Sequence, residues 1–267
     1  MMDLGALPEL GIDPTQPFAV LADLHANIEA VTAVAECLDK RGIRDALVLG
    51  DLIGYGASPQ ETLDFVREHR WRAVRGNHED MLLDLSHVER TRSLKPSARK
   101  ALEWTRFQID SDSIEQLAEL PLAARLGPKG IAVHGSLVDP RHCYAYIYEF
   151  SAERNADLLR ALAPPAGTIV WFGHTHQRAV WVVRPASCVA IEPLATMWLS
   201  EHVLHLVNPG SVGFPRDGDY RSAFVVYDPT SRRLELLRAA YDIATAAKKI
   251  RQGRYDETLA DRLLAAR

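Results

Sequence analysis

Residues 18–25, Phe-Ala-Val-Leu-Ala-Asp-Leu-His, place a short apolar run directly before an Asp-x-His triplet. Four further polar blocks also follow apolar runs, in the order Gly50-Asp51, Gly76-Asn77-His78-Glu79, His134-Gly135 and Gly173-His174-Thr175-His176. Short apolar runs of this kind are typical of buried strands. Because each block follows a strand, all five are expected at one rim of a sheet, where their oxygen and imidazole donors converge on metal.

The first 75 residues alternate between strand and helix patterns. Apolar runs at 18–22, 46–49 and 71–75 are separated by helical patterns at 27–39 and 58–69. Connections of that length are long enough for crossovers between parallel strands. They predict an α/β fold in which helices cover a parallel sheet, with ligands bound beyond the carboxyl ends of its strands.

The remaining chain predicts further layers. Residues 79–126 have helical patterns without a strand signal, which indicates a helical cap inserted in one domain spanning 1–267. Short alternating runs between 179 and 237 predict a second, partly antiparallel sheet stacked on the first. We therefore expect two stacked mixed β-sheets flanked by helices. Residues 1–16, interrupted by Pro8 and Pro14, are expected to form a loose N-terminal arm.

Composition excludes several classes of partner. A formal net charge of -4, without a block of basic residues, argues against binding of a nucleic acid polymer. No apolar run is long enough to span a membrane, so no membrane partner is expected. The three cysteines, Cys37, Cys143 and Cys188, are far apart and odd in number, which favours a reducing cytoplasm over a disulfide framework.

As a set, the five polar blocks resemble the signature of the calcineurin-like metallophosphoesterases: DxH, GD, GNH(D/E), H and GHxH. The resemblance covers about residues 18–212 and implies a four-layer α/β/β/α fold. It implies one metal ion held by Asp23, His25, Asp51 and His176, and a second held by Asp51, Asn77, His134 and His174. Asp51 would then bridge two divalent ions. Nitrogen and oxygen ligands suit manganese, iron, cobalt or zinc, and manganese is favoured.

The charges of this ligand set fit a phosphate. Two divalent ions bring about +4, and Asp23 and Asp51 cancel only about half of it. The resemblance implies in-line attack on phosphorus by a hydroxide shared between the ions. It also places His78 near the leaving group, as an acid or electrostatic stabiliser; a supporting hydrogen bond is the alternative. The other histidines are assigned to the surface or to packing: His69, His87, His142, His202 and His205.

Tyr55 and Arg216 are the candidate residues for contacts with the substrate. Tyr55 stands where Ser/Thr protein phosphatases and symmetrical diadenosine tetraphosphatases carry a phosphate-holding arginine. The Gly50–Gly56 block and residues 208–219 instead resemble compact bacterial phosphoesterases, similar to phosphodiesterases and to nucleotide or dinucleoside-polyphosphate hydrolases. Tyr55 either binds a phosphate oxygen or packs on its loop. Arg216 either binds a phosphate or pairs with a neighbouring aspartate.

Three tyrosines alternate after the fourth block: Tyr144, Tyr146 and Tyr148. In an extended segment their rings share one face, which suits stacking of a nucleobase or, equally, packing in a sheet or dimer contact.

These patterns favour a metal-dependent phosphoesterase acting on a small phosphorylated molecule, a nucleotide phosphodiester or dinucleoside polyphosphate. The alternatives are a Ser/Thr protein phosphatase and a protein-binding scaffold without activity. Association of identical chains is left open.

Overall fold

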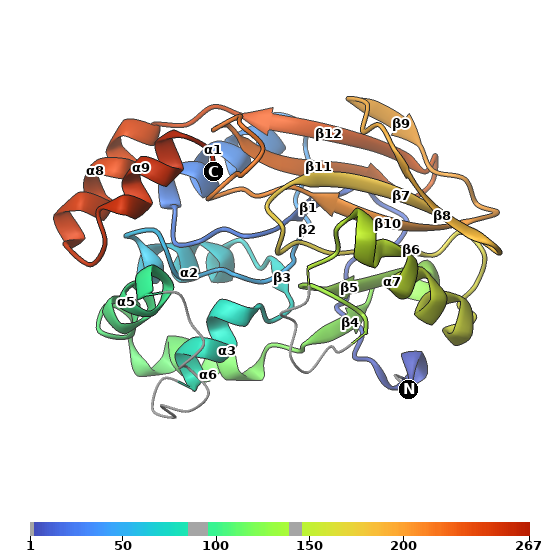
Figure 1. The fold of residues 1–267 in the computed structure, drawn as a ribbon, viewed down its shortest axis with the longest axis horizontal. Helices are drawn as coiled ribbons and strands as arrows, with labels where there is room; N and C mark the ends of the chain where they lie inside the picture. Colours follow the sequence, from blue (N-terminus) through green and yellow to red (C-terminus); the bar gives the residue numbers. More distant parts are fainter. Residues whose placement is uncertain (1–2, 85–95, 139–145) are drawn as a thin grey trace.

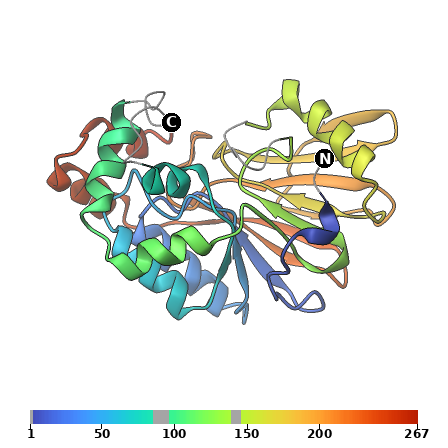
Figure 2. The ribbon, with the colours of Figure 1, turned by 90° about the horizontal axis from the view of Figure 1, so that it is seen from below.

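In the computed structural model, which describes residues 3–84, 96–138 and 146–267, two six-stranded sheets stack face to face. Helices cover the outer faces of both sheets (Figures 1 and 2). The expected two-sheet α/β fold is therefore confirmed. Its two sheets also meet along one rim, where the polar blocks lie.

The first sheet joins strands from both ends of the chain. Its order is β3 (Arg72–Ala73), β2 (Ala46–Val48), β1 (Phe18–Leu21), β11 (Ser222–Asp228), β12 (Arg233–Ala239) and β9 (Thr196–Trp198). The first three strands are parallel, and β11 pairs with β1 in antiparallel register. The carboxyl ends of β1, β2 and β3 consequently point to the same rim.

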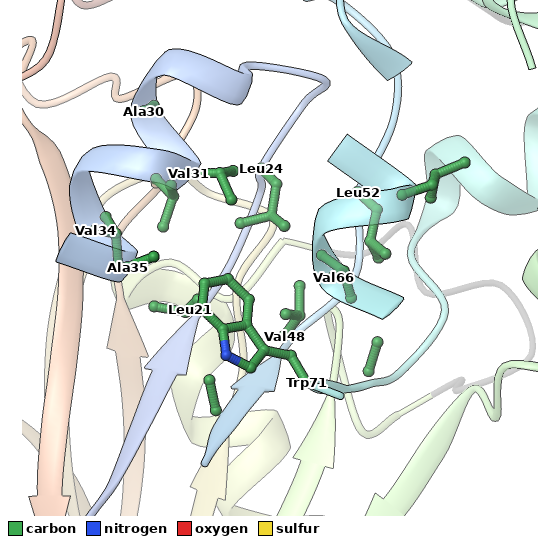
Figure 3. Close-up of a cluster of buried hydrophobic side chains, with 14 of the residues drawn as sticks. Leu21, Leu24, Ala30, Val31, Val34, Ala35, Val48, Leu52, Val66 and Trp71 are labelled. Atoms are coloured by element: carbon green, nitrogen blue, oxygen red, sulfur yellow. The ribbon is translucent and has the colours of Figure 1, made fainter. Parts of the chain in front are cut away.

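Helices α1 (Ile28–Asp39) and α2 (Pro59–Glu68) cover the outer face of this sheet. The side chain of Asn27 accepts a hydrogen bond from the backbone N–H of Ala30 and so begins α1. Its buried face, which includes Val31 and Val34, packs on Leu21 and Val48 of the sheet (Figure 3). Full burial of each such aliphatic side chain stabilises the fold by about 1.5–3 kcal/mol.

The second sheet has the order β4 (Ala123–Arg125), β5 (Gly130–Val133), β6 (Ile169–Trp171), β10 (Leu204–Pro209), β7 (Arg178–Arg184) and β8 (Ser187–Ile191). Strands β5 and β6 are parallel, so their carboxyl ends reach the rim together. Helix α7 (Glu149–Leu162) covers the outer face, where Ala156 and Leu159 pack against Phe172.

Alternating residues of the central strands build two separate cores. In β1, Ala19 and Leu21 face the helices, whereas Phe18 and Val20 face the other sheet. The inner core between the sheets includes an aromatic group in which Phe18, Trp171 and Tyr227 meet edge to face. Burial on both faces explains the continuous apolar runs in the sequence.

Three details differ from the sequence-based expectations. The strands between 179 and 237 do not form one sheet, because β9, β11 and β12 extend the first sheet while β7, β8 and β10 belong to the second. The stretch 79–126 contains helices α3 (Asn77–Leu83), α5 (Pro96–Arg106) and α6 (Ser111–Glu119), but it also contains β4, which pairs with β5. Short strands rich in alanine, as β4 is, carry little β-propensity of their own.

The described part of the N-terminal arm is packed and not loose. It contains a short 3-10 turn, η1 (Leu4–Ala6). The N–H of Arg125 donates to the carbonyl of Pro8, the N–H of Leu10 donates back to Arg125, and Ile12 is buried in the inner core. A second 3-10 turn, η2 (Gly127–Lys129), follows β4, and helices α8 (Ile243–Gly253) and α9 (Thr258–Leu264) pack beside the rim. Among the described residues no helix is long and apolar enough to cross a bilayer.

His205, on the central strand β10, gives the fold a pH dependence. It is 2% exposed, and burial together with the charge of Arg232 lowers its pKa to about 4. Because the unfolded ring binds a proton near pH 6.5 and the folded ring does not, stability is present above pH 6.5 and is lost as the pH falls toward 4.

Replacing this ring should remove that loss. Between pH 7.5 and pH 5 we expect the free energy of unfolding of the unaltered protein to fall by about 2 kcal/mol more than that of His205→Gln. Urea unfolding with a chelator present at both pH values measures the difference. Equal losses in the two proteins would contradict the assignment.

Candidate metal centre

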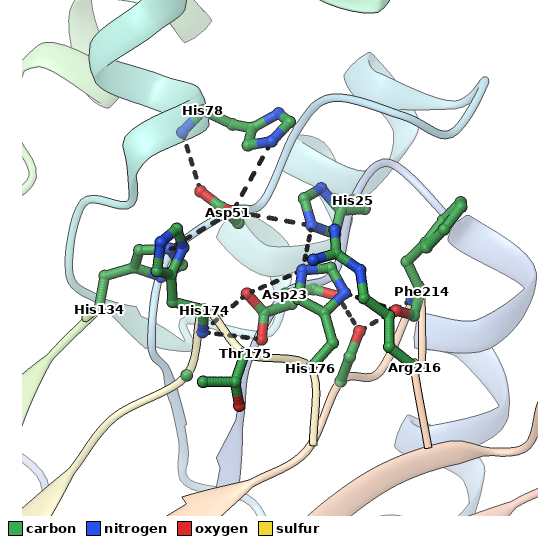
Figure 4. Close-up of polar contacts among 12 residues, drawn as sticks. Asp23, His25, Asp51, His78, His134, His174, Thr175, His176, Phe214 and Arg216 are labelled. Carbon is green, nitrogen blue, oxygen red and sulfur yellow. Dashed lines mark hydrogen bonds and ion pairs between the residues drawn. The ribbon is translucent and has the colours of Figure 1, made fainter. Parts of the chain in front are cut away.

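The seven predicted ligands come together at the shared rim of the two sheets. Figure 4 labels all of them except Asn77. The first sheet supplies Asp23 and His25 after β1, Asp51 after β2 and Asn77 after β3. The second supplies His134 after β5, with His174 and His176 after β6. All seven are buried, with at most 6% exposed. Their donor atoms form two groups that share Asp51: Asp23, His25, Asp51 and His176, and Asp51, His134 and His174.

In the first group, two ring nitrogens face each other without a proton between them. The Nδ1 atoms of His25 and His176 lie against the backbone carbonyls of Ile53 and Phe214, so each Nδ1–H donates to a carbonyl. Burial lowers the pKa of both rings well below its usual value, so both are neutral. Their Nε2 lone pairs then point at each other across 3.1 Å. Only a cation between them makes this arrangement favourable.

The second group also contains a ring that is oriented by a backbone carbonyl. His134 Nδ1 donates to the carbonyl of Leu49 at 2.6 Å, which leaves its Nε2 directed at Asn77 Oδ1 at 2.9 Å and His174 Nδ1 at 3.1 Å. Although burial opposes it, the adjacent Asp51 carboxylate raises the pKa of His134 to about 9. In the absence of an ion the ring itself therefore carries the positive charge that this cluster of acceptors requires.

Asp23 and Asp51 are buried, and no Lys or Arg among the described residues forms an ion pair with either carboxylate. Burial raises the pKa of Asp23 to about 7, while the charge of His134 opposes the rise. For Asp51, the positive charges of His134 and His78 outweigh burial and hold the pKa well below its usual range. A buried carboxylate that stays ionised requires cations nearby. The donor set thus fits divalent metal ions, with carboxylate and imidazole ligands and no thiolate.

Five of the predicted ligands have a left-handed backbone, which is rare for residues other than glycine. Their φ angles lie between 46° and 67°: Asp23, His25, Asp51, His174 and His176. Such conformations cost of order 1 kcal/mol or more each and persist only where the surrounding structure enforces them. Here they turn the chain sharply at the strand ends and direct each side chain toward the shared rim.

Glu79 is a residue whose role the sequence analysis missed. Its buried carboxylate accepts hydrogen bonds from the N–H groups of Gly76, Asp51 and Leu52, at 2.7–2.9 Å, and a longer one from Ile53. It therefore ties the loop that carries Asp51 to the first turn of α3, which carries Asn77 and His78. The Glu after Gly-Asn-His was visible in the sequence as a capping pattern, but its link to a distant loop was not.

The end of β10 and the residues after it support the loops that carry the ligands following β1 and β6. The side-chain amide of Asn208 donates to the carbonyl of Gly173 at 2.8 Å, and the hydroxyl of Ser211 donates to the carbonyl of Asp23 at 2.9 Å. Asn208 and Ser211 are both fully buried. The end of β10 and the loop after it thus fix the backbone on both sides of the rim.

His78 faces the centre without belonging to either ligand group. Its Nε2 lies 3.9 Å from Asp51 Oδ2, and its buried Nδ1 has no hydrogen-bond partner among the residues that the structure describes. The ring rests on Gly54: a Cβ built at Gly54 would lie 2.1 Å from His78 Nδ1. Gly54 also has a φ of +83°, so both space and backbone conformation require glycine there.

Tyr55 and Arg216 lie beside the first ligand group. The Tyr55 ring packs 4.4 Å from the ring of His25 and 4.5 Å from that of His78, centroid to centroid. An Arg216 Nη atom lies 3.5 Å from the Tyr55 hydroxyl, and the buried Nε of Arg216 has no hydrogen-bond partner in the described part of the chain. The aspartates weighed as ion-pair partners of Arg216 are engaged by other arginines, Asp217 by Arg238 and Asp219 by Arg221.

The remaining histidines that the structure describes stay away from the centre. His69 stacks on Phe65, His202 is exposed, and His205 lies in the inner core. Four other residues singled out in the sequence lie outside the described ranges: His87, His142, Cys143 and Tyr144.

A family model described as the calcineurin-like phosphoesterase superfamily domain matches residues 17–232. The chain belongs to this superfamily. It is 31% identical over 249 residues to the uncharacterized protein MJ0912 of Methanocaldococcus jannaschii, covering 93% of this chain and 98% of that protein. The family assignment made from the five polar blocks is therefore confirmed.

Solved structures agree with the fold. A metallophosphoesterase from Sphaerobacter thermophilus superposes with a TM-score of 0.79 at 29% identity, covering 95% of this chain and all of that one. The hypothetical protein PH1004 from Pyrococcus horikoshii superposes with a TM-score of 0.73 at 17% identity, covering 92% and 97% of the two chains, which is a likeness of fold. Family and buried Asp/His cluster together make this protein a metal-dependent phosphoesterase.

Gly54 provides a test of how His78 is placed. Gly54→Ala should displace the ring and lower turnover by at least about tenfold while metal content stays unchanged, because Gly54 touches His78 and belongs to no ligand group. Metal analysis and initial rates measure the two effects.

Gly218→Ala is the matched control. Gly218 has nearly the same φ, +80°, but has open space where its Cβ would lie. Equal loss of turnover in the two variants would mean that backbone strain, and not the position of His78, is responsible.

Proposed function

We propose that this protein uses two divalent transition-metal ions, with manganese favoured, to hydrolyse a small phosphate ester. The first ion would be held by Asp23, His25, Asp51 and His176, and the second by Asp51, Asn77, His134 and His174. The observation that carries this proposal is the pair of unprotonated Nε2 atoms of His25 and His176, facing each other at 3.1 Å beside two buried carboxylates.

Two such ions would polarise a phosphoryl group and supply a water nucleophile at neutral pH. The protein's contribution is to keep the centre positively charged, because it provides two carboxylates and otherwise neutral ligands. That excess charge is complementary to a phosphate ester. The left-handed turns at the strand ends hold the ligand side chains in place before the substrate arrives.

His78 is proposed as the group that donates a proton to the leaving oxygen. Burial lowers the pKa of this ring below its usual value, and the nearby Asp51 carboxylate opposes the decrease. An imidazole is the side chain best suited to donate a proton at neutral pH. Its ring is fixed between Gly54 and Tyr55. An acid held rigidly over the centre needs no rearrangement at the moment of reaction.

Arg216 and Tyr55 are proposed to bind the phosphate oxygens. The Arg216 guanidinium lies close to His25 and His176 (Figure 4), and none of the described carboxylates pairs with it. Burial raises the pKa of Tyr55, so its hydroxyl remains a hydrogen-bond donor. A planar guanidinium and a phenol can together bind two oxygens of one phosphate.

The ester itself is proposed to be a nucleotide phosphodiester or a dinucleoside polyphosphate. A cytoplasmic location, and any association of identical chains, stay predictions from the sequence.

A substrate screen tests the proposal. In manganese, the purified protein should hydrolyse linear or cyclic nucleotide diesters, or dinucleoside polyphosphates, faster than phosphopeptides. Release of nucleotide or phosphate is measured, with Asp51→Asn as the blank. Preference for phosphopeptides would establish the protein-phosphatase alternative instead. Uptake of two equivalents of manganese without hydrolysis of any ester would overturn the proposed activity.

The separate roles of Asp51 and His78 give a second test. Asp51→Asn should lose bound metal, because it removes the carboxylate common to both groups. His78→Ala should keep its metal and lose about 10²- to 10⁴-fold in turnover. His202→Ala, which removes an exposed histidine, is the control. Full activity of His78→Ala at normal metal content would refute its assignment.

A further inference from the structure

Tyr146 is an exposed aromatic residue that touches the metal centre. Its ring stacks on that of His174, with centroids 4.0 Å apart and planes inclined by 14°. His174 is 6% exposed, whereas Tyr146 remains 39% exposed. A large aromatic surface is thus open to solvent one imidazole ring away from the second group of ligands.

Tyr148 continues this stack. Its ring lies 5.4 Å from that of Tyr146, centroid to centroid, at an interplanar angle of 19°. The rings of His174, Tyr146 and Tyr148 therefore form a nearly parallel series beside the second group of ligands.

The backbone holds the two tyrosines in place. Ile147, between them, is 1% exposed and belongs to the core under α7. The hydroxyl of Ser151 donates to the carbonyl of Tyr146 at 2.8 Å and accepts from the N–H of Tyr148 at 2.9 Å. These contacts fix the segment before any ligand binds, which reduces the entropy lost when a ligand stacks on the rings.

This arrangement suits a substrate with a flat aromatic group near its phosphate. A sugar phosphate or an alkyl phosphate would fill the metal and Arg216 contacts but would not contact the exposed part of the Tyr146 ring. A nucleobase would extend the series of parallel rings, and every base has a π-face that can stack in this way. In a nucleotide the sugar lies between the phosphate and the base. In the protein the imidazole of His174 lies between the second group of metal ligands and the Tyr146 ring, so phosphate and base can reach their two sites together.

We propose that Tyr146 and Tyr148 form an aromatic platform on which the nucleobase of the substrate stacks while its phosphate occupies the metal centre. This inference rests on the proposed phosphoesterase function and assigns the residues that bind the base of its substrate. The two tyrosines determine specificity for the base, and the metal ligands and Arg216 bind the phosphate.

The test compares two ligands that differ only in the base. AMP and ribose 5-phosphate are titrated into the manganese-loaded protein by calorimetry, and chromatography checks that both stay intact. The unaltered protein should bind AMP about 5- to 150-fold more tightly. Tyr146→Leu should lose most of this ratio, Tyr146→Phe should keep it, and affinity for ribose 5-phosphate should stay the same in all three.

Trp198→Leu is the control, because Trp198 is an exposed aromatic residue on the edge strand β9, paired at the end of β12 far from the rim. An unchanged ratio in Tyr146→Leu, or equal weakening of both ligands, would overturn the proposal. If Tyr146→Leu loses its metal, the same two titrations are made with Tyr148→Leu, and an unchanged ratio of affinities in that variant would overturn the proposal. Binding is measured without turnover, so a protein that prefers AMP but hydrolyses no ester would refute the proposed function and leave the platform standing.

Discussion

The structure depends on keeping two carboxylates and four imidazoles together out of water. Asp23 and Asp51 are at most 1% exposed, and the histidine nitrogens around them point inward because backbone carbonyls engage their other nitrogens. Without cations this arrangement is unfavourable, since carboxylates and lone pairs repel one another at these distances. Metal ions would attract these carboxylates and lone pairs and so offset their mutual repulsion. The cluster that opposes folding without metal is therefore the one that favours metal binding.

The backbone does much of the positioning. Left-handed turns place the ligands at the strand ends, and Glu79, Asn208 and Ser211 hold the loops that contain them. These residues act on N–H and carbonyl groups, and not on the ions. Their contribution explains how side chains far apart in the sequence, such as His25 and His176, lie within 3.1 Å of each other.

The sequence was informative where signals are local. Apolar runs predicted the central strands, and polar blocks at their ends predicted which side chains would meet, because parallel strands bring their carboxyl ends to one rim. Strand partners were not predictable in this way. Nothing in residues 222–239 says that β11 pairs with β1 and not with β10, since both faces of either strand are buried. Similarly, Ala123 and Ala124 give no sign of β4, and the carboxylate of Glu79 gives none of its contact with the Asp51 loop.

One feature of the rim has a mechanical consequence. Four of the seven predicted ligands follow strands of the first sheet and three follow strands of the second. Each of the two groups of donor atoms contains residues from both sheets, and Asp51 belongs to both groups. Metal ions bound there would link the two sheets at one end, while the aromatic contacts of Phe18, Trp171 and Tyr227 join the sheets at the other end. Binding of metal ions at this rim would then stabilise the folded protein against unfolding by mass action, because the unfolded chain does not hold these ligands together. The catalytic centre would thus also contribute to the stability of the fold.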